Sequence, residues 1–169
     1  GMNYKISHPN KIIDGSIYLP ASKSISNRVL IIQALCEKEF EIDNLSDAED
    51  TKILQNALSN NSNEINVNGS GTAMRFLTAF FAIKKQETTL IGNKRMHERP
   101  IKPLVDALNS LGGNIEYVEN EGFPPILIKK SKILGGEVEI DSTISSQFIS
   151  ALLLISPSLE KGIKIYLIG

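Results

Sequence analysis

The chain has 169 residues, of which 18 are Lys or Arg and 19 are Asp or Glu, so its formal net charge is −1 at pH 7. With 41% hydrophobic residues it can bury a core, which excludes wholesale disorder, and its charge balance excludes a strongly basic nucleic-acid-binding protein. A single cysteine cannot form an internal disulfide, and only two histidines accompany it, which argues against a zinc site. No stretch is long and apolar enough for a membrane span or a secretion signal. We therefore expect a cytoplasmic protein without a metal or a membrane partner.

The first part of the chain reads as two strands followed by alternating helices and strands. Short β-type segments on either side of Asp14-Gly15 predict a strand pair within residues 4–20. Helical spacing of apolar residues predicts a helix over residues 24–36, with Cys36 in the core. A strand at 39–42, a helix at 47–59 and a strand at 65–67 follow. Ser46, with Glu49 three residues later, predicts a capping box at the start of the second helix.

The remaining two thirds restart the same alternation twice. A helix is expected over 71–84, a strand at 88–91, and a helix that opens at Pro100 and stops at Gly112-Gly113. Strands at 114–118, 126–129 and 138–140, a helix at 145–155 and a strand at 163–167 complete the chain. Alternation of this kind predicts an α/β fold with helices packed on mixed sheets.

Self-comparison indicates an internal repeat. Residues 70–79 match residues 142–151 at an offset of 72, and residues 28–30 match residues 75–77 at an offset of 47. The unequal offsets fit one unit with insertions in its loops, and the third copy is incomplete. A unit present about three times is typical of architectures in which each copy covers the apolar face of its neighbour.

Each repeat opens a helix with small polar residues and a cation or amide. These openings are Lys23-Ser24 with Arg28, Gly71-Thr72 with Arg75, and Ser145-Ser146-Gln147. Helix N-termini carry unpaired N–H groups and a partial positive charge, so they bind phosphate and carboxylate readily. A cation at that end opposes the helix dipole and needs an anionic partner, either a carboxylate or a ligand. Taken alone, Ser24 and Thr72 are each interpreted as an ordinary N-cap.

The segment 93–100 gathers Lys94, Arg95 and Arg99 in one loop between a strand and a helix. It reads either as a solvated basic loop or as an anion site. Arg99 precedes Pro100, which would place its guanidinium at the start of the next helix, and a guanidinium fork suits phosphate or carboxylate. His97 is interpreted as a surface loop residue. The cluster of Asp47, Glu49 and Asp50 is interpreted as ordinary negative charge at a helix N-terminus.

Taken together, four motifs resemble those of the enolpyruvylshikimate-phosphate (EPSP) synthases, the 3-phosphoshikimate 1-carboxyvinyltransferases. The motifs lie at Leu19–Arg28, Gly71–Arg75, Arg95–Ile101 and Ser145–Phe148. They occur in the family's order and cover nearly the whole chain. Jointly they are highly specific, whereas each motif alone carries less weight.

The resemblance implies two lobes, each built from three βαβαββ units around pseudo-threefold symmetry. Residues 1–20 would then be leading strands of the second lobe, and residues 21–169 the first lobe, truncated within its third unit. The implied reaction transfers the enolpyruvyl group of phosphoenolpyruvate to the 5-hydroxyl of shikimate 3-phosphate and releases phosphate, with no metal or organic cofactor. A monomer is implied for the full enzyme, and the surface left by the missing lobe would allow the fragment to self-associate.

The same resemblance implies roles for individual residues. Lys23 would contact both substrates and stabilise charge in the addition step. The residues assigned to shikimate 3-phosphate are Lys23, Ser24, Arg28, Ser145, Ser146 and Gln147. Those assigned to phosphoenolpyruvate are Lys23, Gly71, Arg99 and Gln147, with Arg75 in a supporting role. Electrostatic preorganisation would supply much of the rate.

Two positions and the length of the chain depart from the family pattern. Gly69 stands where the family often has Asn, and Phe76 where many members have Pro. Family enzymes are more than twice as long, so we expect this fragment to fold, bind an anion and not catalyse.

Three alternative functions stay open. They are a non-catalytic anion-binding or regulatory half-protein, a UDP-amino-sugar enolpyruvyl transferase, and an RNA-end-processing enzyme. The sugar enzyme expects a catalytic Cys in a loop, whereas Cys36 is predicted in a helix.

Overall fold

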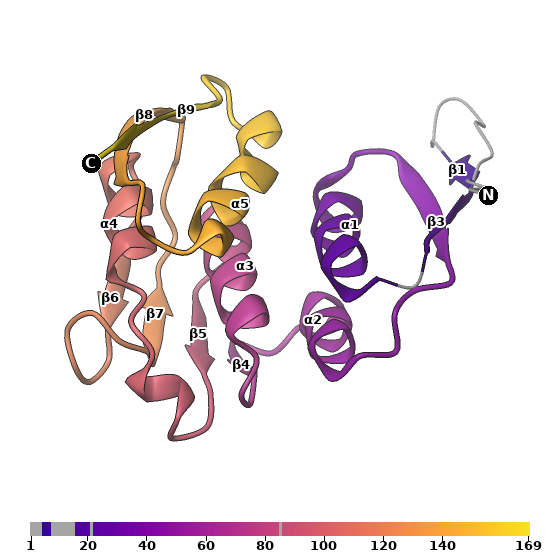
Figure 1. The fold of residues 1–169 in the computed structure, drawn as a ribbon, viewed down its shortest axis with the longest axis horizontal. Helices are drawn as coiled ribbons and strands as arrows, with labels where there is room; N and C mark the ends of the chain where they lie inside the picture. The colour runs from indigo at the N-terminus through magenta and orange to yellow at the C-terminus, as the bar shows by residue number, and fades with distance from the viewer. Residues whose placement is uncertain (1–4, 8–15, 21, 85) are drawn as a thin grey trace. The chain divides into compact units, whose positions relative to one another are not determined.

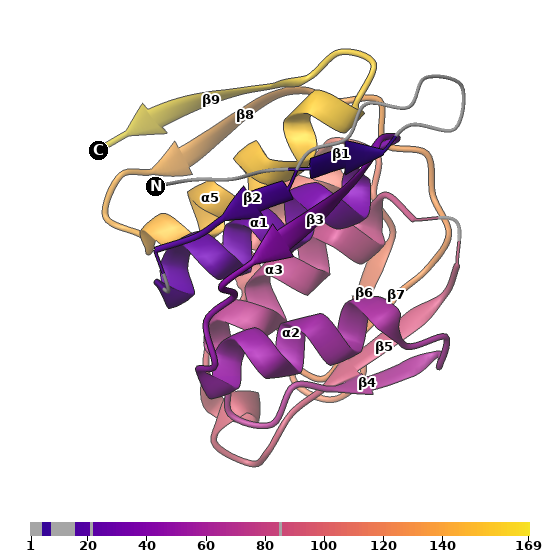
Figure 2. The same ribbon diagram turned by 90° about the vertical axis from the view of Figure 1, so that its right-hand side faces the viewer.

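A computed structural model describes residues 5–7, 16–20, 22–84 and 86–169. The chain divides into two compact units, residues 1–58 and 59–169. The first unit contains β1 (Lys5–Ser7), β2 (Ser16–Tyr18), α1 (Lys23–Leu35), β3 (Glu39–Asp43) and α2 (Glu49–Ser59), as Figures 1 and 2 show. The predicted division at residue 20 concerns the lobes of a longer enzyme and stays a prediction.

In the first unit β3 is the central strand. It pairs with β2 in parallel and with β1 in antiparallel fashion. The two leading strands were therefore predicted correctly, but their pairing with one another was wrong because β3 lies between them. The turn predicted at Asp14-Gly15 lies outside the described residues.

The two helices of the first unit are joined by a buried polar contact. The Thr51 hydroxyl of α2 donates to Asn27 Oδ1 of α1 at 2.7 Å, and both side chains are buried. Leu30 and Ile31 of α1 and Leu54 of α2 are buried with them. A hydrogen bond in such surroundings fixes which helix faces meet, because an unpaired polar group there would be costly.

The described residues of the second unit form two sheets and three α-helices, which Figures 1 and 2 show from two sides. Its elements are β4 (Glu64–Asn66), α3 (Gly71–Ala82), β5 (Thr88–Ile91), α4 (Lys102–Ser110), β6 (Ile115–Tyr117), β7 (Ile126–Ile128), β8 (Gly136–Asp141), α5 (Ser146–Ile155) and β9 (Ile163–Ile168). One sheet has the order β4-β5-β7-β6, with β4 and β5 parallel and the other pairs antiparallel. In the second sheet β8 and β9 are parallel over six residues.

Helix α3 is the central element of the second unit. All of its residues are buried except Thr72 and Arg75. A helix that is apolar on nearly every side belongs in the interior, and α3 packs against α4, α5, β5 and β7. In both views α3 and α5 run side by side (Figures 1 and 2). Thr72 and Arg75 are therefore polar exceptions on a core helix.

The predicted repeat is visible in the connections. A parallel strand pair is joined through one helix three times, as β2-α1-β3, β4-α3-β5 and β8-α5-β9. The segment from β4 to β7 has the complete βαβαββ order. The predicted α/β class with mixed sheets is confirmed.

Three local predictions were wrong. The backbone N–H of Ser46 donates to Ser26 Oγ at 3.0 Å, so it is not the partner of Glu49 that a capping box requires. The Ser46 hydroxyl instead accepts from the N–H of Ala48, at 3.1 Å. Helix α4 begins at Lys102 and not at Pro100, because a short 3₁₀ turn, Met96–Glu98, precedes it. Cys36 follows the last residue of α1 and is exposed, not buried.

Candidate functional site

The three helix starts are capped differently. At α3 the Ser70 hydroxyl accepts from the N–H of Ala73 at 3.0 Å, and at α5 the Ser145 hydroxyl accepts from the N–H of Gln147 at 3.2 Å. At α1 the N-cap residue is Ser22, which forms no side-chain cap. Ser24 and Thr72 are the second residues of their helices, so the interpretation of these two as caps is wrong. Their hydroxyl groups are not committed to capping.

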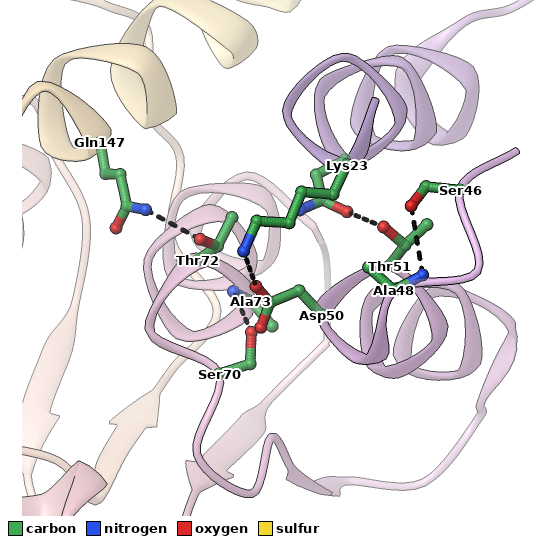
Figure 3. A network of polar contacts seen from close by, with 10 residues as sticks. Lys23, Ser46, Ala48, Asp50, Thr51, Ser70, Thr72, Ala73 and Gln147 are labelled. Carbon is green, nitrogen blue, oxygen red and sulfur yellow. Dashed lines mark hydrogen bonds and ion pairs between the residues drawn. The ribbon is translucent and has the colours of Figure 1, made fainter. Parts of the chain in front are cut away.

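In the first unit, the predicted residues Lys23, Ser24 and Arg28 lie on the first two turns of α1. Lys23 Nζ lies 3.5 Å from Asp50 Oδ2, and the lysine side chain is 62% exposed (Figure 3). Arg28 Nη1 donates to the backbone oxygen of Ser24 at 2.9 Å. An exposed ion pair of this length contributes about 0.5 kcal/mol, so an anionic ligand can compete for the ammonium group. Asp50 of the acidic cluster at the start of α2 is thus the ion-pair partner of Lys23.

In the second unit, the guanidinium of Arg99 lies directly on Gly71, the first residue of α3. A Cβ placed on Gly71 would stand 2.2 Å from Arg99 Nη1 and 2.6 Å from Arg99 Cζ. Only glycine allows this approach, because it has no Cβ. Arg99 was predicted at the start of the helix that follows it. That prediction is corrected in one respect: the guanidinium lies at the N-terminus of α3, whereas α4 begins three residues later.

Arg75, one turn into α3, has neutral partners. Its Nη1 donates to Gln147 Oε1 of α5, and its guanidinium lies 4.7 Å from the centre of the Phe148 ring. Burial lowers the pKa of Arg75, and the neighbouring charge of Arg99 lowers it further. The ion pairs formed between described residues include neither Arg75 nor Arg99. Two neighbouring cations without a carboxylate partner favour an anion.

A pocket opens beside Arg99. It has a volume of about 360 Å³ and is lined by Gly69, Asn93, Arg95, Met96 and Arg99. Gly71, Arg75 and Arg99 pack closely at the start of α3 and leave no space there for a water molecule. Arg95 and Arg99 line the open pocket, so the basic loop of the sequence places two of its cations there.

The loop that carries these cations is fixed by side-chain contacts. Asn93 Oδ1 accepts from the N–H of Met96 at 2.9 Å, which starts the 3₁₀ turn. His97 Nε2 accepts from the N–H of Gly92 at 3.0 Å, and its imidazole is half-buried. This hydrogen bond links residues 92 and 97 of the loop. Met96 of this turn is buried. Sequence reasoning gave Asn93 no role, although an Asn just before a short turn is a recognisable signal.

The remaining predicted residues, Ser145, Ser146 and Gln147, lie at the start of α5. Gln147 Nε2 donates to Thr72 Oγ1 of α3 at 2.8 Å (Figure 3). Ser145 and Ser146 are exposed. The second unit therefore joins Thr72 and Arg75 of α3 to Gln147 of α5 and places Arg99 against Gly71. The first unit holds Lys23, Ser24 and Arg28.

Among the described residues, no three His, Cys, Asp or Glu side chains come together as metal ligands would. In the same part of the chain, no helix has both the length and the apolar character needed to cross a bilayer.

Comparison with known proteins gives one consistent result. A family model described as EPSP synthase (3-phosphoshikimate 1-carboxyvinyltransferase) matches residues 7–61 and 54–169. A 3-phosphoshikimate 1-carboxyvinyltransferase of Bacteroides fragilis strain YCH46 is 47% identical over 168 residues, covering 99% of this chain and 41% of the relative. The enzyme of that name from Histophilus somni strain 2336 is 40% identical over 190 residues, covering 95% of this chain and 44% of the relative. The chain thus spans about two fifths of the length of these relatives.

Solved structures agree on the fold. The EPSP synthase from Acinetobacter baumannii matches with a TM-score of 0.71 and 19% identity, over 82% of this chain and 38% of that one. Cys36 is exposed and follows the last residue of α1, so its predicted place in a helix no longer argues against a UDP-amino-sugar enolpyruvyl transferase, although the family and the relatives that match are described as 3-phosphoshikimate 1-carboxyvinyltransferases.

Proposed function

Because this chain belongs to the EPSP synthase family, we propose that it supplies anion-binding residues to an enzyme that transfers the enolpyruvyl group of phosphoenolpyruvate to the 5-hydroxyl of shikimate 3-phosphate. Phosphate and 5-enolpyruvylshikimate 3-phosphate would be the products. Both substrates carry a phosphate and a carboxylate, so a site for them needs several cations and N–H donors.

One observation carries the proposal: Arg75 and Arg99 are neighbours at the start of α3 without a carboxylate partner among the described residues. Like charges brought together on a partly buried surface raise the free energy of the empty site. A bound phosphate or carboxylate reverses that contribution, since it pairs with Arg99, offsets the nearby charge of Arg75 and interacts favourably with the dipole of α3.

Within this proposal each residue has a part that suits its chemistry. Arg99 and the backbone at Gly71 receive phosphoenolpyruvate, and Gln147 donates an amide hydrogen to it. The Lys23 ammonium group exchanges its ion pair with Asp50 for contacts with both substrates, and it stabilises charge in the addition step. The residues that hold shikimate 3-phosphate are Lys23, Ser24, Arg28, Ser145, Ser146 and Gln147. The chain spans about two fifths of the length of its relatives, so we expect these residues to form one part of the complete active site.

The test is a calorimetric titration of the chain with phosphoenolpyruvate. Arg99→Gln removes the guanidinium, and we expect a loss of affinity of about tenfold or more, as for a charged hydrogen bond. Lys94→Gln is the matched control, because Lys94 is an exposed cation of the same loop that does not line the pocket. Equal affinities of the two variants would refute the proposal.

A further inference from the structure

The side-chain amide of Gln147 is held on both sides by residues of α3. Its Oε1 accepts from Arg75 Nη1, and its Nε2 donates to Thr72 Oγ1 at 2.8 Å. Thr72 and Arg75 are the two residues of α3 that are not buried. The polar exceptions on this core helix therefore converge on one residue of α5.

These contacts determine which way the amide faces. A guanidinium can only donate hydrogen bonds, so the amide oxygen must face Arg75 and the NH₂ group must face Thr72. The opposite orientation would set two donors against each other. An NH₂ group has two hydrogens, and the Thr72 hydroxyl takes one of them. The second hydrogen is available to an acceptor on a ligand.

Arg75 and Arg99 are suited to different tasks. The Arg75 guanidinium is half-buried, lies over the Phe148 ring and is engaged with Gln147. Arg99 is exposed, borders the open pocket and has no ion-pair partner among the described residues. A guanidinium held between a ring and an amide has little freedom to reach a ligand, whereas its planar fork suits it to orient the amide.

We propose that Arg75 is a positioning residue that holds the Gln147 carboxamide with its NH₂ group toward the anion site, so that Gln147 serves as an N–H donor to the bound anion. This inference rests on the proposed function, because the anion is the phosphoenolpyruvate of that proposal. Arg75 then acts on the ligand through Gln147 and not by direct contact.

A double-mutant cycle on phosphoenolpyruvate affinity separates the two possibilities. Arg75→Lys keeps the positive charge but removes the planar fork, and Gln147→Ala removes the amide. If Arg75 acts through Gln147, each single variant weakens binding by about tenfold and the double variant by about tenfold as well. If Arg75 touches the anion itself, the two losses multiply to about a hundredfold, and that result would overturn the proposal.

A second measurement needs no ligand. The Gln147 side-chain NH₂ signals of the ¹⁵N-labelled chain are compared in the wild type and in Arg75→Lys, with Lys94→Gln as the control. We expect the signals to move to the position of a solvent-exposed amide in Arg75→Lys only. Unchanged signals in a folded Arg75→Lys chain would overturn the inference. If the wild type binds no phosphoenolpyruvate, the proposed function fails, and this readout still decides whether Arg75 orients Gln147.

Discussion

Replacing Gly71 by Ala tests the contact between α3 and Arg99 with a single methyl group. The new Cβ would lie 2.2 Å from Arg99 Nη1, whereas ordinary van der Waals contact begins at 3.4 Å, so the guanidinium must retreat by about 1.2 Å (3.4 − 2.2). Arg99 is exposed and its side chain is flexible, so it can move without disturbing the core. The steric conflict therefore falls on the position of the cation.

The expected result is a separation of stability from binding. Alanine is a better helix former than glycine by about 0.5–1 kcal/mol, so the free energy of unfolding should stay the same or rise. A charge-assisted hydrogen bond contributes about 1.5–3 kcal/mol, and losing it through the displaced Arg99 should lower phosphoenolpyruvate affinity by about ten- to 150-fold. A loss of binding without a loss of stability is the signature of a displaced cation.

Calorimetric titration and urea unfolding of the same preparations measure the two quantities. Lys94→Gln is the control, because Lys94 is an exposed residue of the same loop and does not line the pocket. The reasoning is refuted if Gly71→Ala binds phosphoenolpyruvate as tightly as the wild type, or if both variants lose affinity equally.

Three further expectations concern other parts of the chain. Lys23→Met should change the free energy of unfolding by less than about 0.5 kcal/mol, since its ion pair with Asp50 is exposed, but should weaken shikimate 3-phosphate binding in a titration; unchanged affinity would exclude Lys23 from the site. The Tyr117 hydroxyl is buried with no hydrogen-bond partner in the described structure, and burial first, then nearby carboxylates, raise its pKa to about 12. Tyr117→Phe should therefore leave urea stability unchanged or raise it by about 1 kcal/mol, and a clear decrease would show that the hydroxyl has a partner. The backbone and side chain of Thr143 both donate to Asp141 and lower the pKa of that carboxyl, so Thr143→Val should raise it in a ¹³C NMR titration. A carboxyl with a lowered pKa stabilises the fold above its unfolded-state pKa and loses that effect as the pH falls through its folded-state pKa. Any loss of stability in Thr143→Val should therefore be present at neutral pH and vanish in acid. A loss of stability that persists in acid would point to another cause.

Most of the fold could be predicted from the sequence because apolar periodicity reports local structure. The helix expected over 24–36 is α1, and the strand expected at 88–91 is β5 with the same bounds. The repeat was also predictable, because each helix of the three βαβ connections begins with small polar residues followed by a cation or an amide. The errors were of another kind. The partner of the Ser46 N–H is Ser26, twenty residues away, and no local pattern reports such a contact.

The candidate site could be predicted in its residue types but not in its contacts. Motif spacing brought out Arg75, Arg99 and Gln147 as separate features. Their relationship depends on the packing of α3 against α5 and on the fold of the loop after β5, where the 3₁₀ turn carries Arg99 back onto Gly71. The offset of 72 that aligned two repeats is also the separation of the Arg75 and Gln147 partners. Arg75 and Gln147 therefore occupy equivalent positions in two repeats, although the sequence alone gave no reason to expect a contact between them.

The central claim is that an anion binds where Arg99 lies against the first turn of α3. Its most direct test is a ¹⁵N NMR titration of the chain with phosphoenolpyruvate, following backbone and side-chain signals. We expect saturable shifts at Gly71, Thr72, Arg99 and the Gln147 NH₂ group, retained in Lys94→Gln and lost in Arg99→Gln. Shifts spread evenly over the surface lysines, or a response that survives in Arg99→Gln, would contradict the claim.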